Sequence, residues 1–261
     1  MGTLFDPVRR TIGDAIVRYL TQQSKDFEPA STSDPAKLRQ VLRPGDVVLV
    51  EGSTRVAGII KYLTQSTWSH SALYIGDELG SGDPHMLIEV DVKDGCIAVP
   101  LTKYEQAQTR ICRPVGLDQT GRKAVIDFMI SRIGLEYDTK NVVDLARYLI
   151  PKPPVPVRFR RRMLALGSGD PTRAICSTLI AQAFEAIKYP VLPKITRATA
   201  TTSRKRQQRS EILHIRHYSL YTPRDFDLSP YFSVIKPTIE SGFDYRELRW
   251  RRPPEPEELA S

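Results

Sequence analysis

Short apolar runs separated by turn residues dominate the chain between residues 44 and 116. The first run follows a Pro-Gly pair, which is typical of a turn that leads into a strand. Two further runs flank residues 76–84, a segment rich in Gly, Asp and Pro, as expected for strands joined by a hairpin. The predicted strands are 47–50, 70–75, 86–92, 96–101 and 110–115. Together they indicate a small antiparallel sheet.

The apolar spacing changes to a helical period after this region. In residues 119–133 the apolar side chains recur every three or four positions, and Gly134 is placed to end the helix. Residues 176–187 have the same spacing and carry their apolar side chains on one side. Helices that accompany an antiparallel sheet without alternating with its strands predict an α+β fold.

The two ends of the chain differ in character from this central part. Residues 4–22 have helical spacing with three arginines between the apolar positions, so this amphipathic helix either packs on the domain or lies in a membrane surface. The remaining segments are predicted to be a polar linker (23–43), a proline-rich and then basic insertion (151–171), a loop (196–211) and a disordered tail (253–261). The predicted domains are 1–42 as an N-terminal helix and linker, 43–235 as one globular domain, and 236–261 as an extension.

The net charge of +8 is concentrated in arginine-rich groups. These groups lie at 158–162, 204–209 and 246–252, and they are either solvated loops or a surface for anionic lipid headgroups. No nucleic-acid-binding motif accompanies them, so we do not expect nucleic acid as a partner. The chain has no apolar run of eighteen residues and no secretory signal pattern at its start, so we expect a cytoplasmic protein, either free in solution or bound peripherally at the inner face of the membrane.

The three cysteines do not form a recognisable framework. Cys96, Cys112 and Cys176 are too few and too scattered for a set of disulfides, and no CxxC pair indicates zinc. We therefore predict no metal and no cofactor.

Cys176 stands where an apolar helical stripe begins. A thiol at a helix N-terminus or beside an imidazolium has a lowered pKa and becomes a nucleophile. Asp170 and Pro171 also resemble a helix start, and a helix that begins there would place Cys176 in its interior instead of at its N-terminus. A cysteine in an apolar context is more often a core residue, so spacing alone does not identify a nucleophile.

His70 stands at the mouth of a predicted strand. If the hairpin is centred near Gly80, Glu89 lies opposite Ala72 and Asp91 lies opposite His70, all on one face. Either carboxylate is then within reach of the imidazole. A cross-strand ion pair without catalytic purpose is the alternative.

Five motifs in a distinctive order point to a family. They are Pro44-Gly-Asp-Val-Val-Leu49, Thr67-Trp-Ser-His70, Ile88-Glu89, Gly134-x-x-Tyr137-Asp138 and Ile175-Cys176-Ser177. This order resembles the YiiX/YebB-like permuted papain-like cysteine hydrolases of the NlpC-type superfamily, which are related to the lecithin retinol acyltransferase group. The resemblance covers about 43–235 and implies a circularly permuted papain-like fold, with an antiparallel sheet packed on the nucleophile helix.

The resemblance also implies roles for individual residues. Cys176 matches the nucleophile, His70 the general base, Glu89 the polar third member in preference to Asp91, and Tyr137 a substrate-pocket tyrosine. The implied activity is cleavage of an amide bond in a peptide or small amide through a thioester. A lipid-directed thioesterase or acyltransferase acting on an acyl-lipid at the membrane is one alternative, and a non-catalytic binding module is another. The insertion 151–171 has no counterpart in the family pattern.

Overall fold

The computed structural model describes residues 18–19, 21–23, 34–91, 93–135, 176–198, 210–214 and 221–249, with only the backbone described for 194–198 and 210–214. Tyr137, the insertion 151–171, the tail 253–261 and most of the predicted helix 4–22 lie outside these residues. The domain boundaries at 42/43 and 235/236 stay predictions.

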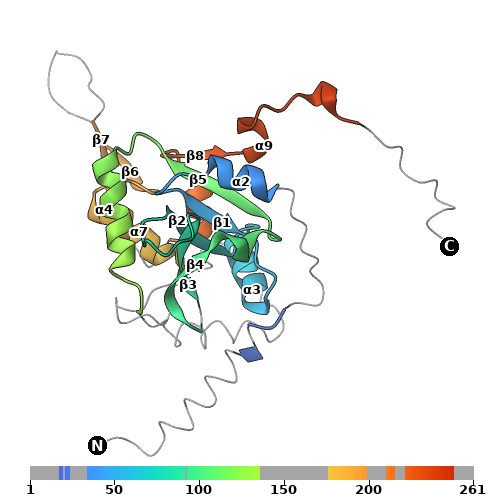
Figure 1. The fold of residues 1–261 in the computed structure, drawn as a ribbon. Coiled ribbons are helices and arrows are strands. Elements are labelled where there is room, and N and C mark those ends of the chain that lie inside the picture. Colours follow the sequence, from blue (N-terminus) through green and yellow to red (C-terminus); the bar gives the residue numbers. More distant parts are fainter. Residues whose placement is uncertain are drawn as a thin grey trace, which may run out of the picture.

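A six-stranded antiparallel sheet forms the centre of the molecule (Figure 1). Its strands, in spatial order, are β4 (Gly95–Pro100), β3 (Met86–Asp91), β2 (His70–Gly76), β1 (Val47–Val50), β5 (Thr109–Pro114) and β8 (Phe232–Ile235). The first five occupy the positions that the apolar runs predict, to within one residue at each end. β8 was not predicted and pairs with β5 at the sheet edge.

One face of the sheet is covered by two neighbouring helices, α4 (Gln119–Ile130) and α7 (Cys176–Ala186) (Figure 1). Alternate residues of the strands point to this face, because successive side chains of a strand alternate between the two sides. The core on this side includes Val47, Leu49, Leu73, Ile75, Ile88, Val90, Val125, Met129, Leu179 and Phe184. Helix α7, which begins at Cys176, therefore packs directly on the sheet.

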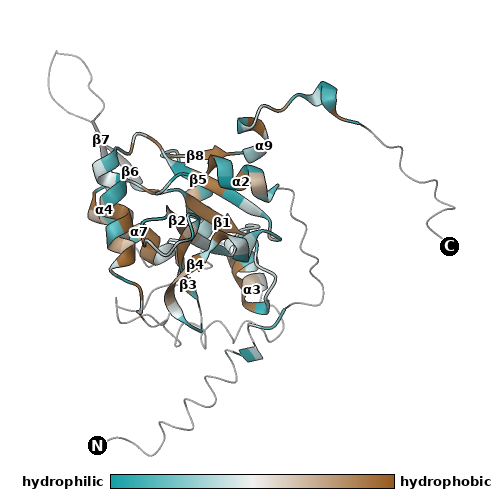
Figure 2. Cartoon of the chain, in the orientation of Figure 1, coloured by the Kyte–Doolittle hydropathy of each residue, from teal (hydrophilic) through white to brown (hydrophobic). Residues whose placement is uncertain are grey.

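The opposite face carries a smaller core. It includes Val48, Val50, Ala72, Tyr74, Leu87, Val99, Ile111 and, from outside the sheet, Leu38, Leu101 and Tyr104. Both β1 and β2 thus bury side chains on two sides, and the middle of the sheet is strongly apolar in Figure 2. This arrangement confirms the predicted α+β class.

Several predicted boundaries were wrong. The supposed linker 23–43 contains helix α2 (Pro35–Val41), which has Asp34 as its N-cap. The supposed loop 196–211 overlaps a two-stranded ribbon of β6 (Lys194–Ala198) and β7 (Ser210–His214). Helix α4 ends at Ile130 rather than at 133, because the backbone then turns so that the Gly134 amide bonds to the Cys96 carbonyl at 2.8 Å.

The described part of the chain also contains several short elements. They are α3 (Arg55–Thr64), the 3₁₀ helix η1 (Leu101–Tyr104), α8 (Pro223–Asp227), α9 (Pro237–Glu240) and the 3₁₀ helix η4 (Tyr245–Glu247). Over the residues that the structure describes, no helix combines the length and apolar character needed to cross a membrane. Peripheral contact through residues 4–22 stays a prediction, since most of that segment is outside the described residues.

Candidate active site

Cys176 is the first residue of α7 and is buried, with 6% of its surface exposed. The neighbouring Ser177 hydroxyl donates to the Tyr221 carbonyl oxygen at 2.8 Å, which fixes the first turn of the helix to the segment before α8. The Cys176 thiol faces His70 and Ser71 at the start of β2. The sheet and the first turn of the helix therefore meet at this sulfur.

His70 is the first residue of β2, at the end of the strand. It pairs with Val50 across the sheet, and its ring is partly exposed. Its Nε2 atom lies 3.1 Å from Glu89 Oε2. Nδ1 is consequently the ring nitrogen that remains for Cys176. His70 thus connects a thiol from the α7 layer with a carboxylate on the other side of the sheet.

Glu89 lies opposite Ala72 in the β2–β3 pairing, as the hairpin argument predicts. Its side chain is buried, and its carboxylate accepts hydrogen bonds from the Tyr104 hydroxyl and the Lys103 ammonium as well as from His70. Three donors around one buried carboxylate satisfy it and hold it in place. The sequence patterns did not single out Lys103 or Tyr104, because they belong to a 3₁₀ turn whose return to Glu89 has no local signal.

Asp91 has a different environment. Its Oδ1 accepts from the backbone amides of Lys93 at 2.7 Å and Asp94 at 3.2 Å. It therefore stabilises the turn between β3 and β4. Of the two carboxylates left open by the strand pattern, Glu89 is the one that contacts His70.

The charges of these groups reinforce one another. Burial alone would lower the pKa of His70, but the adjacent Cys176 thiolate and the hydrogen-bonded Glu89 outweigh it and raise the pKa to about 10. Burial would raise the pKa of Glu89, but His70, Lys103 and Tyr104 lower it to about 2. Burial would likewise raise the pKa of Cys176, yet the charge and hydrogen bond of His70, with hydrogen bonds from Ser71, lower it. The arrangement favours a thiolate–imidazolium pair supported by a carboxylate.

The other two cysteines have the opposite character. Burial, with the nearby Glu89 charge, raises the pKa of Cys96 to about 11. Burial also raises the pKa of Cys112, well above the usual range of a thiol. Neither has an imidazole among its described partners. Cys176 is therefore the thiol whose surroundings favour the nucleophilic form.

No group of three or more His, Cys, Asp or Glu side chains is placed to hold a metal ion within the described part of the chain. Tyr137, predicted to line the substrate pocket, lies outside the described residues.

The predicted resemblance is confirmed by comparison with known families. Residues 41–148 match the permuted papain-like amidase enzyme family (YaeF/YiiX, C92 family), which indicates a hydrolase of the amidase or peptidase type. This match contains His70 and Glu89 and ends before Cys176. Among solved structures, the metalloprotein yiiX from Escherichia coli O157:H7 has a TM-score of 0.47 and 10% identity, covering 74% of this chain and 96% of its own. A comparison with curated protein sequences found no match.

Proposed function

We propose that the protein is a cysteine hydrolase that cleaves an amide bond in a peptide or small amide through Cys176, His70 and Glu89. The observation that carries this proposal is the position of His70, whose ring lies between the Cys176 thiol and the buried Glu89 carboxylate. A nucleophile, a base and a group that orients the base are the minimal set for acyl transfer. The match to an amidase family supports the same class of reaction.

In the starting state of the proposed reaction, Cys176 is a thiolate and His70 carries its proton as an imidazolium. The thiolate attacks the substrate carbonyl carbon, and the oxygen gains negative charge, which backbone amides at the α7 N-terminus stabilise. The C–N bond then breaks, and the imidazolium gives its proton to the departing amine. A thioester on Cys176 remains. His70 next takes a proton from water, whose hydroxide attacks the thioester and releases the acid and the thiol.

Glu89 keeps His70 oriented in this proposal. Its carboxylate accepts a hydrogen bond from the Nε2–H group of His70, so Nδ1 faces the thiol throughout the cycle. Lys103 and Tyr104 hold Glu89 in its ionised form, because both donate to the carboxylate. They act as positioning residues that work through Glu89.

A panel of fluorogenic amide, ester and thioester substrates tests the proposal, combined with intact-mass detection of an acyl-enzyme. We expect amide turnover and a covalent adduct that maps to Cys176, with both lost in Cys176→Ala. Cys96→Ala is the matched control, since it removes a buried thiol outside the proposed site. It should retain activity in proportion to folded protein.

Other outcomes discriminate the alternatives. Turnover of acyl-lipid esters or thioesters without amide cleavage would replace the amidase by a lipid-directed enzyme. Transfer of the acyl group to an added alcohol or amine in preference to water would make it a transferase. A folded protein that turns over no substrate and forms no adduct would leave a binding module.

A further inference from the structure

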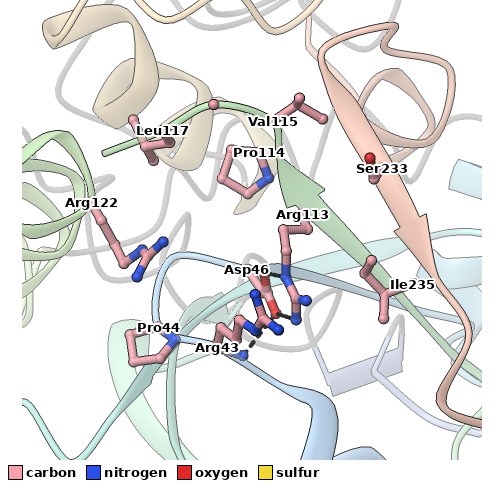
Figure 3. Close-up of a pocket in the computed structure, with 11 residues that line it drawn as sticks. Arg43, Pro44, Asp46, Arg113, Pro114, Val115, Leu117, Arg122, Ser233 and Ile235 are labelled. Atoms are coloured by element: carbon pink, nitrogen blue, oxygen red, sulfur yellow. Dashed lines mark hydrogen bonds and ion pairs between the residues drawn. The ribbon is translucent and has the colours of Figure 1, made fainter. Parts of the chain in front are cut away.

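A cavity of about 320 Å³ lies at the end of β1 opposite the candidate active site (Figure 3). Asp46 precedes β1, whereas His70 pairs with Val50 at the other end of that strand. At roughly 3.3 Å per residue, the two sites are about 13 Å apart along the strand. The cavity shares no residue with the Cys176 site.

The cavity has an excess of positive charge. Its lining contains three arginines, Arg43, Arg113 and Arg122, and one carboxylate, Asp46. Asp46 is buried and fully engaged: it accepts from Arg113 Nε at 2.8 Å, Arg113 Nη2 at 2.7 Å and the Arg43 backbone amide at 2.8 Å. Asp46 and Arg113 therefore neutralise each other. Two guanidinium charges remain.

Arg43 and Arg122 have no carboxylate partner among the described residues. Of the two, Arg122 is partly buried on α4, and Figure 3 shows its side chain extending toward Arg43, Asp46 and Arg113. Glu78 lines the adjoining hollow together with Arg122 and Lys123, and it forms no ion pair with Arg122 in the described part of the chain. An anion that enters the cavity would meet two free guanidinium groups.

The position of Arg122 depends on a glycine. Gly45 has a φ of +92°, and a Cβ atom there would lie 2.9 Å from Arg122 Cγ. The aliphatic part of Arg122 therefore packs over the bare Gly45 backbone, which limits the freedom of its guanidinium. A side chain ordered before binding loses less entropy when the ligand arrives.

We propose that this cavity binds a phosphate monoester. A guanidinium presents two parallel N–H donors to two oxygens of a phosphate, and a doubly charged group balances the two unpaired arginines. Pro44, Pro114, Val115, Leu117 and Ile235 form apolar walls around the arginines, which favours a phosphate that carries an apolar substituent. The cavity volume is at the lower end of the range for small-molecule sites, about 300–1,000 Å³.

Isothermal titration at fixed ionic strength tests this site. The probes are inorganic phosphate, glycerol 3-phosphate and monomeric dihexanoyl phosphatidate, with acetate as a singly charged control. We expect saturable binding of all three phosphates, weaker binding of acetate, and the highest affinity for the phosphatidate because of the apolar walls. Equal affinity for phosphatidate and glycerol 3-phosphate would assign the site to soluble phosphate esters instead of lipid headgroups.

Two variants locate the binding. Arg43→Gln and Arg122→Gln should each raise the dissociation constant for phosphate about tenfold or more, since each removes charge-assisted hydrogen bonds. Lys123→Gln is the matched control, because it removes the same charge from the next residue of α4, where Lys123 is already paired with Asp127. Thermal unfolding and alkylation of Cys176 should be unchanged in all three. The proposal is overturned if phosphate does not saturate the protein, or if Lys123→Gln weakens binding as much as Arg122→Gln.

Discussion

The charge on His70 links the three residues of the candidate active site. Its ring lies between two groups that carry negative charge, the Cys176 thiolate and Glu89, and each stabilises the imidazolium. The same imidazolium lowers the pKa of both partners. The three protonation states are therefore coupled, and removal of one group changes the other two.

Alkylation of the cysteines measures this coupling. Because the pKa of Cys176 is lowered, iodoacetamide should modify it at pH values below the usual range of a thiol, before Cys96 or Cys112. In His70→Ala the imidazolium is absent, so the inflection of rate against pH should move upward. At pH 6 the rate should then fall about tenfold or more. Faster modification of Cys96 or Cys112, mapped by peptide mass, would contradict the assignment.

Glu89 and Asp91 provide a matched pair of substitutions on one strand. Glu89→Gln removes the charge that orients His70, whereas Asp91→Asn alters a carboxylate that bonds only to backbone amides among the contacts described. We expect kcat/KM to fall by tens to thousands of fold in Glu89→Gln and to stay near the wild-type value in Asp91→Asn. Near-native activity of both variants would remove Glu89 from the mechanism.

Tyr104 and Tyr74 are a second matched pair, since both side chains belong to the same core cluster. The Tyr104 hydroxyl donates to Glu89, and the Tyr74 hydroxyl lies 2.8 Å from His85 Nδ1. Each change to Phe should cost about 1 kcal/mol in free energy of unfolding. Only Tyr104→Phe should also lower kcat, by several fold, and shift the pH dependence of the rate. Identical pH profiles in both variants would limit Tyr104 to a structural role.

At the scale of elements, a buried ion pair ties β1 to β5. Asp46 is 1% exposed and bonds to Arg113 through both oxygens, and Arg113 also donates to the Val41 carbonyl oxygen at the end of α2. Asp46→Ala leaves the guanidinium without its partner in a buried setting, so we expect a loss of about 3–5 kcal/mol in free energy of unfolding. Urea denaturation measures this loss.

The control for Asp46→Ala is an exposed pair. Lys123 and Asp127 are one helical turn apart on α4, and both side chains are more than half exposed. Asp127→Ala should leave the denaturation midpoint within experimental error, because water and salt screen such pairs. A comparable loss in both variants would mean that burial does not set the strength of the Asp46–Arg113 contact.

The pattern of apolar residues predicted most elements of the sheet but missed some elements outside it. Strands β1 to β5 send alternate side chains to the two cores and are bounded by turns, so a short stretch of sequence is enough to predict each of them. Helix α3 was missed because Gly58 interrupts a short apolar stripe. The ribbon of β6 and β7 was missed because its Thr- and Arg-rich sequence is typical of loops. For α2, Asp34 followed by Pro35 is a recognisable helix start. It was not used because the polar composition of the segment is also typical of a linker.

At the scale of the whole molecule, the parts of the site differ in how far they can be predicted. One hairpin and its two-residue alternation place both Glu89 and Asp91 within reach of His70, and the family resemblance selected Glu89, which is the carboxylate that contacts the imidazole. The meeting of His70 with Cys176 joins residues more than one hundred positions apart, and only the family resemblance indicated it. Lys103 and Tyr104 reach Glu89 because η1 folds back over β3 after β4. This contact is tertiary, and no periodic pattern of residues in the sequence indicates it.

The stability of the whole molecule should depend on pH through Glu89. Its pKa is about 2 in the folded protein against an ordinary value of 4.5, so the contribution is complete above pH 4.5 and is lost as the pH falls toward 2. The difference corresponds to about 3 kcal/mol. His70 adds nothing to this loss, because its pKa is raised in the folded protein and it stays protonated in both states below pH 5.

This dependence can be isolated with variants on a Cys176→Ser background, which removes the titration of the thiol. Urea denaturation between pH 6 and pH 2 gives the free energy of unfolding at each pH. With Glu89 present, the free energy of unfolding should fall more steeply below pH 4.5 than in Glu89→Gln. The difference in slope should correspond to the uptake of up to one additional proton on unfolding. Asp91→Asn should retain the steeper fall. Parallel curves for the background and Glu89→Gln would show that the folded protein does not hold Glu89 in its ionised form, and the carboxylate would then be unable to support the imidazolium of His70.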